Sequence, residues 1–173
     1  MIEAWAEKLA ISIKNANTRE TSSIAVMTYA LIIVINFLIP YTSAAIIGLL
    51  TGTLLETGFS IMMLVLVRAV SGGYHFQSSA LCTLVTLSVA AGAPHLPFPE
   101  DWILLATGLC FILFAIFAPA NIKGYARMPE KYFPVMKILS LFIVGSNFFI
   151  QSPTLTIILL LQALSLVIPN KRR

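Results

Sequence analysis

Long apolar runs, separated by short polar or proline-containing stretches, make up most of the chain. Six such runs are present, at residues 21–39, 43–67, 75–93, 102–118, 135–150 and 154–168. Continuous apolar runs predict membrane helices rather than strands, because an isolated helix satisfies its own backbone hydrogen bonds in lipid. Several runs are shorter than the ~20 residues that cross a ~30 Å hydrocarbon layer, so interfacial residues must extend these spans. The pattern predicts an all-α integral membrane protein, with one membrane domain over residues 1–173 and six transmembrane helices bundled within residues 21–168.

The first twenty residues show a different pattern, in which apolar positions recur at helical spacing. These positions are Ile2, Trp5, Leu9 and Ile13, and charged residues occupy another face. The pattern predicts an amphipathic interfacial helix at residues 1–20, lying on the inner leaflet, with a docking surface for a partner helix as the alternative. Charged residues precede the first apolar run, so no cleavable signal peptide is expected.

Basic residues are distributed on one side of the predicted bundle. The connections at residues 40–42, 94–101 and 151–153 contain none of the eleven Lys and Arg residues. Cytoplasmic stretches of membrane proteins carry an excess of Lys and Arg, so we expect both termini inside the cell, with a basic tail at residues 169–173. The net charge of +4 then faces anionic lipid or an acidic partner at the inner membrane face. No nucleic-acid-binding motif accompanies these charges, and a nucleic-acid partner is not expected.

A few polar and small residues interrupt the apolar runs. Glu56 falls inside the second run, where an acid costs ~2.5–3.5 kcal/mol on insertion scales, so we expect it to face protein. Its role is a structural polar contact or a part in substrate or proton handling. Gly48 and Gly52 form a small-xxx-small pair suited to close helix packing, and a homodimer is a further expectation. Hydrogen bonds between helices are predicted for the intramembrane amides, which are Asn36, Asn147 and Gln162.

Composition agrees with a membrane protein, since 58% of the residues are hydrophobic and only 10% are charged. Cys82 and Cys110 both lie inside apolar runs, unlike a secreted disulfide framework, and free thiols are expected. His75 and His95 fall on opposite sides of the predicted bundle, and neither an HExxH nor a paired CxxC motif is present. We therefore expect no metal. No Walker A loop or dinucleotide-binding motif indicates another cofactor.

A histidine and a cysteine lie close together in the stretch SGGYHFQSSALC, residues 71–82. His75 and Cys82 are seven residues apart and share one helical face, but a straight helix would separate them by ~10.5 Å along its axis. A histidine activates a thiol only within ~3–4 Å, so a catalytic pair needs a bend. The two glycines before Tyr74 permit such a bend. We therefore expect the third helix to begin near residues 77–79, with His75 carried back toward Cys82.

The stretch VRAVSGGYHFQSSALC, residues 67–82, resembles the accessory gene regulator protein B family. The resemblance depends on an arginine that ends the second span, a Gly-x-His element, and a cysteine seven residues after the histidine. In this chain they are Arg68, Gly73, His75 and Cys82. Members of the family are six-span membrane cysteine endopeptidases of Gram-positive bacteria, which process the precursor of a cyclic quorum-sensing peptide.

The resemblance implies that His75 and Cys82 are the catalytic pair on the cytoplasmic side. It also implies supporting roles for Arg68, Gly72, Gly73 and Gln77. Phe76 departs from the small residue expected at its position, which changes the expected shape of the pocket but not the chemistry.

The family's chemistry implies a thioester mechanism. The Cys82 thiolate would attack a carbonyl at the C-terminal side of the ring-forming segment, with His75 as general base. A cysteine or serine of the peptide would then close the thioester to a thiolactone or lactone. The oxyanion donors would be backbone N–H groups of residues 79–82 or the Gln77 side chain. Three residues are candidates for orienting the imidazole: Gln77, Ser71 and Glu56.

The inner stretch at residues 121–137 gathers several basic residues, among them Lys123, Arg127 and Lys131. They serve either as positive-inside anchors or as a binding surface for an acidic part of the substrate. The expected partners are the lipid bilayer and a short propeptide with an amphipathic leader and an acidic tail.

Two other classes of function compete with the peptidase. A small transporter or peptide exporter would line a pathway with Glu56 and the amides, although no internal repeat is evident. A non-catalytic membrane assembly subunit would use Cys82 only to fill space. Replacement of Cys82 by serine separates these classes, because it abolishes peptidase activity alone.

Overall fold

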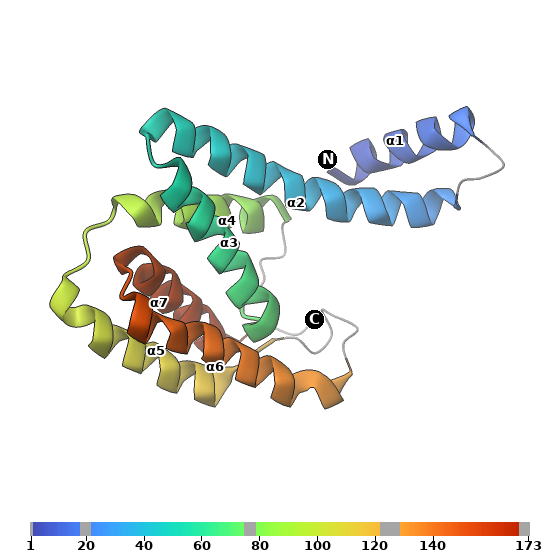
Figure 1. Cartoon of the computed structure of the whole chain (residues 1–173). Coiled ribbons are helices and arrows are strands. Elements are labelled where there is room, and N and C mark those ends of the chain that lie inside the picture. Colours follow the sequence, from blue (N-terminus) through green and yellow to red (C-terminus); the bar gives the residue numbers. More distant parts are fainter. Residues whose placement is uncertain (1, 18–21, 75–78, 122–128, 170–173) are drawn as a thin grey trace. The chain divides into compact units, whose positions relative to one another are not determined.

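A computed structural model describes residues 2–17, 22–74, 79–121 and 129–169. Seven α-helices are formed within these ranges (Figure 1): α1 (Ile2–Ala16), α2 (Ile24–Thr51), α3 (Leu54–Ser71), α4 (Ser79–Gly92), α5 (Ile103–Phe117), α6 (Phe133–Ile150) and α7 (Pro153–Val167). Three short 3₁₀ helices join them: η1 (Ala93–His95), η2 (Glu100–Trp102) and η3 (Glu130–Tyr132). Throughout the described ranges the regular elements are helices, and the all-α prediction is confirmed.

Four of the described helical segments are long and apolar enough to cross a membrane. They are Ile24–Thr51, Leu54–Ser71, Glu100–Phe117 and Glu130–Ile150. Two shorter apolar helices, Leu81–His95 and Pro153–Val167, have lengths between 10 and 17 residues. The chain is therefore a helical membrane protein, whereas the six-span topology and the cytoplasmic termini remain predictions.

The chain forms two compact units, Met1–Ser43 and Ala44–Arg173. In the first unit, one side of the apolar face of α1 is buried and the other side is exposed. Ala6 and Ala10 are buried, whereas Trp5, Leu9 and Ile13 are exposed. The apolar stripe seen in the sequence is thus available on the helix surface, and its place at the membrane interface remains a prediction.

The predicted break at residues 40–42 is wrong, because α2 continues through Pro40 to Thr51. Membrane helices tolerate proline, since other groups satisfy the backbone carbonyl that its missing N–H leaves free. The break lies instead at Gly52, whose φ of 72° is the left-handed conformation that ends many helices. The Thr53 N–H then donates to the Gly48 carbonyl at 2.9 Å.

Because the helix ends before Gly52, two predictions from the sequence are wrong: the packing motif of Gly48 and Gly52, and the mid-span position of Glu56. Gly48 and Gly52 do not form one helical face, because Gly52 lies beyond the end of α2. A Cβ on Gly48 would stand 2.9 Å from the Leu54 Cα. The absence of a side chain at Gly48 therefore allows the start of α3 to pack closely against α2. Glu56 is not in mid-span: it is exposed in the first turn of α3.

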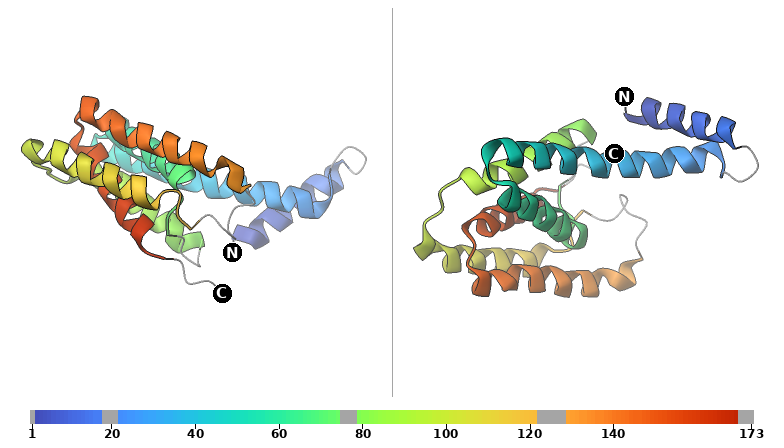
Figure 2. Two further views of the ribbon diagram at one scale, coloured as in Figure 1. Left: turned by 90° about the horizontal axis from the view of Figure 1, so that it is seen from below. Right: turned by 45° about the horizontal axis from the view of Figure 1, so that its top comes forward.

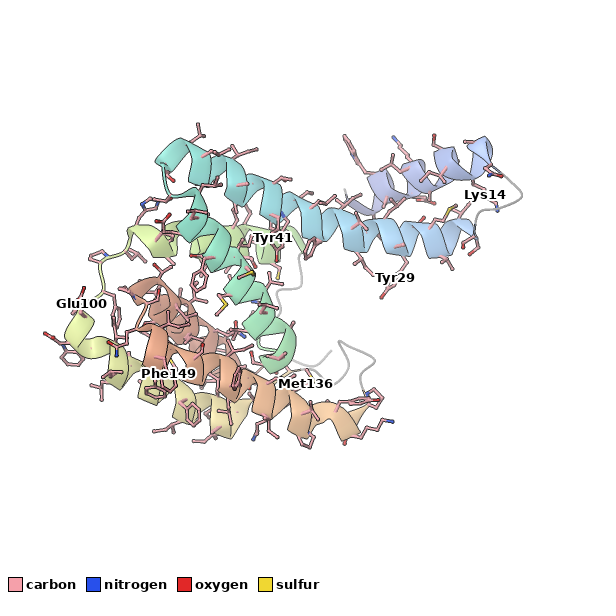
Figure 3. The ribbon with its side chains drawn as sticks, in the orientation of Figure 1. Lys14, Tyr29, Tyr41, Glu100, Met136 and Phe149 are labelled. Atoms are coloured by element: carbon pink, nitrogen blue, oxygen red, sulfur yellow. The ribbon has the colours of Figure 1, made fainter. Side chains whose placement is uncertain are left out.

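The core of the second unit is built around α7, which packs against both α3 and α5 (Figures 1 and 2). Eight of the 15 residues of α7 are buried, more than on any neighbouring helix with comparable length. The main cluster joins it to α3, α5 and α6 through Val67, Cys110, Phe114, Ala118, Val144, Leu155, Leu159, Ala163 and Leu166. Met136 of α6 is buried and Phe149 is exposed, which distinguishes the two faces of that helix (Figure 3).

Local chemistry explains the tight connection between α6 and α7. Gln151 adopts a left-handed conformation after α6, and the Ser152 side chain caps α7 by accepting from the Leu155 N–H at 3.2 Å. Pro153 occupies the first helical position, where its missing N–H costs nothing. These local features end α6 and start α7 with only two residues between them.

A buried amide fastens this end of the unit. The Asn147 Nδ2 donates to Thr107 Oγ1 at 2.9 Å and to Thr156 Oγ1 at 2.8 Å. Its Oδ1 accepts from the Ser152 N–H at 3.1 Å. The prediction that Asn147 hydrogen bonds between helices is confirmed, whereas the Asn36 side chain lies outside the described residues.

Candidate active site

The ends of α3, α5 and α7 meet at one end of the second unit, and α4 begins there. Arg68, Gly72, Gly73 and Cys82 all lie in this region. Lys131 belongs to η3. The other predicted site residues fall outside the described ranges: His75, Gln77, Lys123 and Arg127.

Helix α4 spans Ser79–Gly92, and residues 73 and 74 are not helical, whereas the predicted helix start near residues 77–79 lies partly outside the described residues. Cys82 therefore lies in the first turn of α4, near the positive end of the helix dipole. Its side chain is free and half-buried, whereas Cys110 is buried in the core. A substrate can therefore reach the Cys82 thiol more easily than the Cys110 thiol.

Arg68, in the last turn of α3, reaches across to this first turn. Its Nη2 lies 3.7 Å from the Cys82 Sγ and also donates to the Tyr74 carbonyl oxygen at 2.5 Å. Both contacts use one nitrogen atom, so the Tyr74 carbonyl and the Cys82 sulfur are neighbours. A guanidinium stays protonated, and it places a permanent positive charge beside the thiol.

Gly72 and Gly73 turn the chain between these two helices. Their φ values of 70° and 124° lie in the region that residues with a side chain rarely adopt. The Gly72 N–H closes α3 by donating to the Arg68 carbonyl at 3.0 Å. A Cβ on Gly73 would also stand 2.6 Å from Ser165 Oγ, so both conformation and space require glycine there.

The backbone of this turn is held by segments distant in sequence. The Gly73 N–H donates to the Ala120 carbonyl at 3.0 Å, and the Ala120 N–H donates to the Ser71 carbonyl at 2.9 Å. The Tyr74 N–H donates to the Ser165 carbonyl at 3.0 Å. The residues that follow α5 and the end of α7 therefore fix the path of the chain up to Tyr74.

Gln162 of α7 adds a side-chain contact to the same turn. Its Nε2 donates to Ser71 Oγ at 3.0 Å and to the Gly72 carbonyl at 2.6 Å. The prediction that Gln162 hydrogen bonds between helices is confirmed. Sequence reasoning missed that its partners belong to the candidate site, and no local signal in the sequence points to that pairing.

Two of the three residues considered for orienting the imidazole are described, and their positions differ. Ser71 is buried beside the turn and accepts the Gln162 hydrogen bond. Glu56 lies at the opposite end of α3 from Arg68, and twelve residues of helix correspond to about 18 Å. Glu56 therefore lies far from Cys82. Within the described ranges, no group of three or more His, Cys, Asp or Glu residues is arranged to hold a metal ion.

The two described lysines near the start of α6 have different surroundings. Lys131 is exposed, with its Nζ 5.0 Å from the centroid of the Tyr132 ring. Lys137 donates to the Ala115 carbonyl at 2.8 Å. Pro119 has no N–H for that carbonyl, so the lysine supplies the missing donor. Lys137 is thus part of the packing between α5 and α6, and Lys131 is available at the surface.

Comparisons with known proteins agree on one protein family. The family model described as Accessory gene regulator B matches residues 3–168. A protein of Halalkalibacterium halodurans, named "Putative AgrB-like protein", is 30% identical over 109 residues, which are 60% of this chain and 54% of that protein. The chain thus spans about half the length of this curated relative. No solved structure matches the chain.

Proposed function

Because the chain belongs to the accessory gene regulator B family of a quorum-sensing system, we propose that it is a membrane cysteine endopeptidase. It would cleave the C-terminal part of a short propeptide and promote cyclisation of the product to an autoinducing thiolactone or lactone. Cys82 is the proposed nucleophile and His75 the proposed general base.

The observation that carries the proposal is the double contact of Arg68. A straight helix would keep residues 75 and 82 apart, but the chain bends, and the Arg68 Nη2 contacts both the Tyr74 carbonyl and the Cys82 sulfur. The peptide bond after Tyr74 leads directly to His75. The residue before the proposed base therefore lies beside the proposed nucleophile, which supports their working as a pair.

The proposed reaction has two steps, and each returns its proton. In the first, His75 takes the Cys82 proton while the sulfur attacks a peptide carbonyl, and the C–N bond breaks as His75 protonates the departing amine. In the second, a cysteine or serine of the bound peptide attacks the thioester and loses its proton through His75. The Cys82 thiol is regenerated, and the peptide is a closed ring.

The surroundings of Cys82 favour this chemistry in two ways. The Arg68 guanidinium and the start of α4 both present positive charge to a sulfur that must become negative. The thiol is half-buried at the end of a membrane bundle, where scarce water would slow hydrolysis of the thioester and leave time for ring closure.

The proposed substrate is a propeptide with an amphipathic leader and an acidic tail. Lys131 is exposed in η3, just before α6, and would attract the acidic part together with Lys123 and Arg127. We place this surface and the active site on the cytoplasmic side of the cell membrane of a Gram-positive bacterium, in accord with the one-sided distribution of basic residues.

The test uses purified protein in lipid nanodiscs and a precursor peptide encoded by a short reading frame next to the gene. The parent and Cys110→Ala are expected to yield a cyclic product and a released tail, whereas Cys82→Ala and His75→Ala yield neither. If Cys82→Ala still produces the cleaved peptide, the proposed nucleophile is wrong. Transport or assembly without cleavage would be indicated if the parent leaves the precursor intact.

A further inference from the structure

Among the described residues of the second unit, two side-chain amides are buried, one at each end. Gln162 is 2% exposed and Asn147 is completely buried. Asn147 bonds to two threonines and to the Ser152 N–H, far from Cys82. Gln162 instead bonds to Ser71 and Gly72, which directly precede Gly73 and Tyr74. One amide therefore fastens the bundle, and the other fastens the turn of the candidate site.

The Gly72 carbonyl needs a donor at this place. It lies just beyond the end of α3, in buried surroundings where an unsatisfied carbonyl is costly. The Gln162 Nε2 reaches it at 2.6 Å and uses its second hydrogen on Ser71 Oγ. The amide thus connects the last residue of α3 with the first residue of the turn.

The turn has conformational freedom that this contact limits. Two successive glycines with positive φ leave many alternative paths open to the chain. The Gln162 amide holds Gly72, the Ala120 carbonyl holds the Gly73 N–H, and the Ser165 carbonyl holds the Tyr74 N–H. Gln162 is the side chain in this set, and it can be changed without altering the backbone.

We propose that Gln162 is a positioning residue, which holds the Gly72–Tyr74 turn so that His75 is delivered to Cys82. The inference rests on the proposed function, because it concerns the placement of the proposed base. A displacement of about 1 Å in a catalytic group can reduce a rate by roughly 100-fold. The loss of this amide should therefore lower the rate of thioester formation by about 10- to 100-fold, with little change in KM.

The test compares Gln162→Met, which keeps the side-chain length but has no donor, with Asn147→Leu at the other end. Single-turnover acylation by the precursor peptide is measured for protein that remains folded in nanodiscs. Gln162→Met should acylate slowly with an unchanged KM, whereas Asn147→Leu should lose thermal stability but acylate at the parental rate. Gln162→Asn, which is shorter by one methylene and still polar, should also acylate slowly and provides a second variant if the methionine variant does not fold.

A second readout does not require the peptide. Alkylation of Cys82 by iodoacetamide is measured as a function of pH in the parent, His75→Ala and the Gln162 variants. The inference predicts that the Gln162 profiles move toward that of His75→Ala, while Asn147→Leu keeps the parental profile. If the Gln162 variants keep both the parental profile and the parental acylation rate, the inference is wrong. If the parent does not process the peptide but the profiles still move, the proposed function fails and the positioning of His75 by Gln162 stands.

Discussion

The Arg68 Nη2 lies 3.7 Å from the Cys82 sulfur, and it joins the last turn of α3 to the first turn of α4. The same nitrogen donates to the Tyr74 carbonyl, so one guanidinium contacts the proposed nucleophile and the residue before the proposed base. The positive charge of Arg68 faces the Cys82 sulfur, and the planar shape of its guanidinium allows the second contact with the Tyr74 carbonyl. Substitutions can separate the effect of the charge from that of the shape.

Replacement of Arg68 should affect catalysis according to which of its contacts survives. Arg68→Lys keeps the charge but cannot present two hydrogens in the fixed geometry of a guanidinium, and Arg68→Met loses both contacts. We expect thioester formation to be slowed roughly 10-fold or more by the lysine and about 100-fold or more by the methionine. Single-turnover kinetics with the precursor peptide measure both rates. Equal, parental rates in the two variants would remove Arg68 from the site.

Gly73 is expected to tolerate no side chain. Its φ is 124°, and a Cβ would stand 2.6 Å from Ser165 Oγ and 3.0 Å from Gln162 Nε2. Gly73→Ala should therefore distort the turn and abolish peptide processing. Gly58→Ala is the matched control, because a Cβ at Gly58 meets nothing within 4 Å. Processing assays on membranes with equal amounts of each variant compare the two, and an active Gly73→Ala protein would contradict the proposed role of the turn.

Gly48 should act on folding rather than on association between copies of the chain. A Cβ there would stand 2.9 Å from the Leu54 backbone, which cannot move aside cheaply. Gly48→Ala is expected to cost about 1–3 kcal/mol in the free energy of unfolding, as overpacking usually does. Gly108→Ala, with open space around its Cβ, should cost nothing. Thermal unfolding in detergent gives the stability, and a loss of dimer without a loss of stability would instead restore the packing motif that the sequence indicated.

The two described lysines near α6 should have opposite effects. Lys137→Met leaves the Ala115 carbonyl without a donor, so we expect a loss of about 1 kcal/mol of stability and an unchanged KM. Lys131→Met removes an exposed charge, and it should raise the KM for an acidic precursor without affecting stability. Thermal unfolding and steady-state processing are measured on both variants. If Lys131→Met leaves the KM unchanged, the substrate role assigned to that charge is wrong.

Features that depend on local sequence could be predicted. The two glycines before Tyr74 indicated a turn, and both adopt positive φ values after the end of α3. The intramembrane amides Asn147 and Gln162 were expected to bond between helices, since an unsatisfied amide in lipid is costly, and both do. In each case the prediction follows from a property of the residue itself: glycine permits a turn, and a buried amide must form hydrogen bonds whatever its partner.

Features that depend on competition between two signals, or on distant partners, could not be predicted. Pro40 and Gly52 are both helix breakers by sequence, and the chain breaks at Gly52 because a helix in lipid tolerates the proline. Because the break lies at Gly52, Glu56 is in the exposed first turn of α3 and not in the middle of a span, as the sequence indicated. The hydrogen bonds of Gly73 with Ala120 and of Tyr74 with Ser165 join segments tens of residues apart, and nothing in the local sequence pattern identifies those partners.

The most direct test of the central claim is the mass of the protein after brief incubation with the precursor peptide. Acid quenching preserves a thioester, and peptide mapping locates the added mass. We predict one acyl group on Cys82 in the parent and in Cys110→Ala, and none in Cys82→Ala or His75→Ala. An acyl group on Cys110, or cleavage of the peptide by Cys82→Ala, would contradict the claim that Cys82 is the nucleophile.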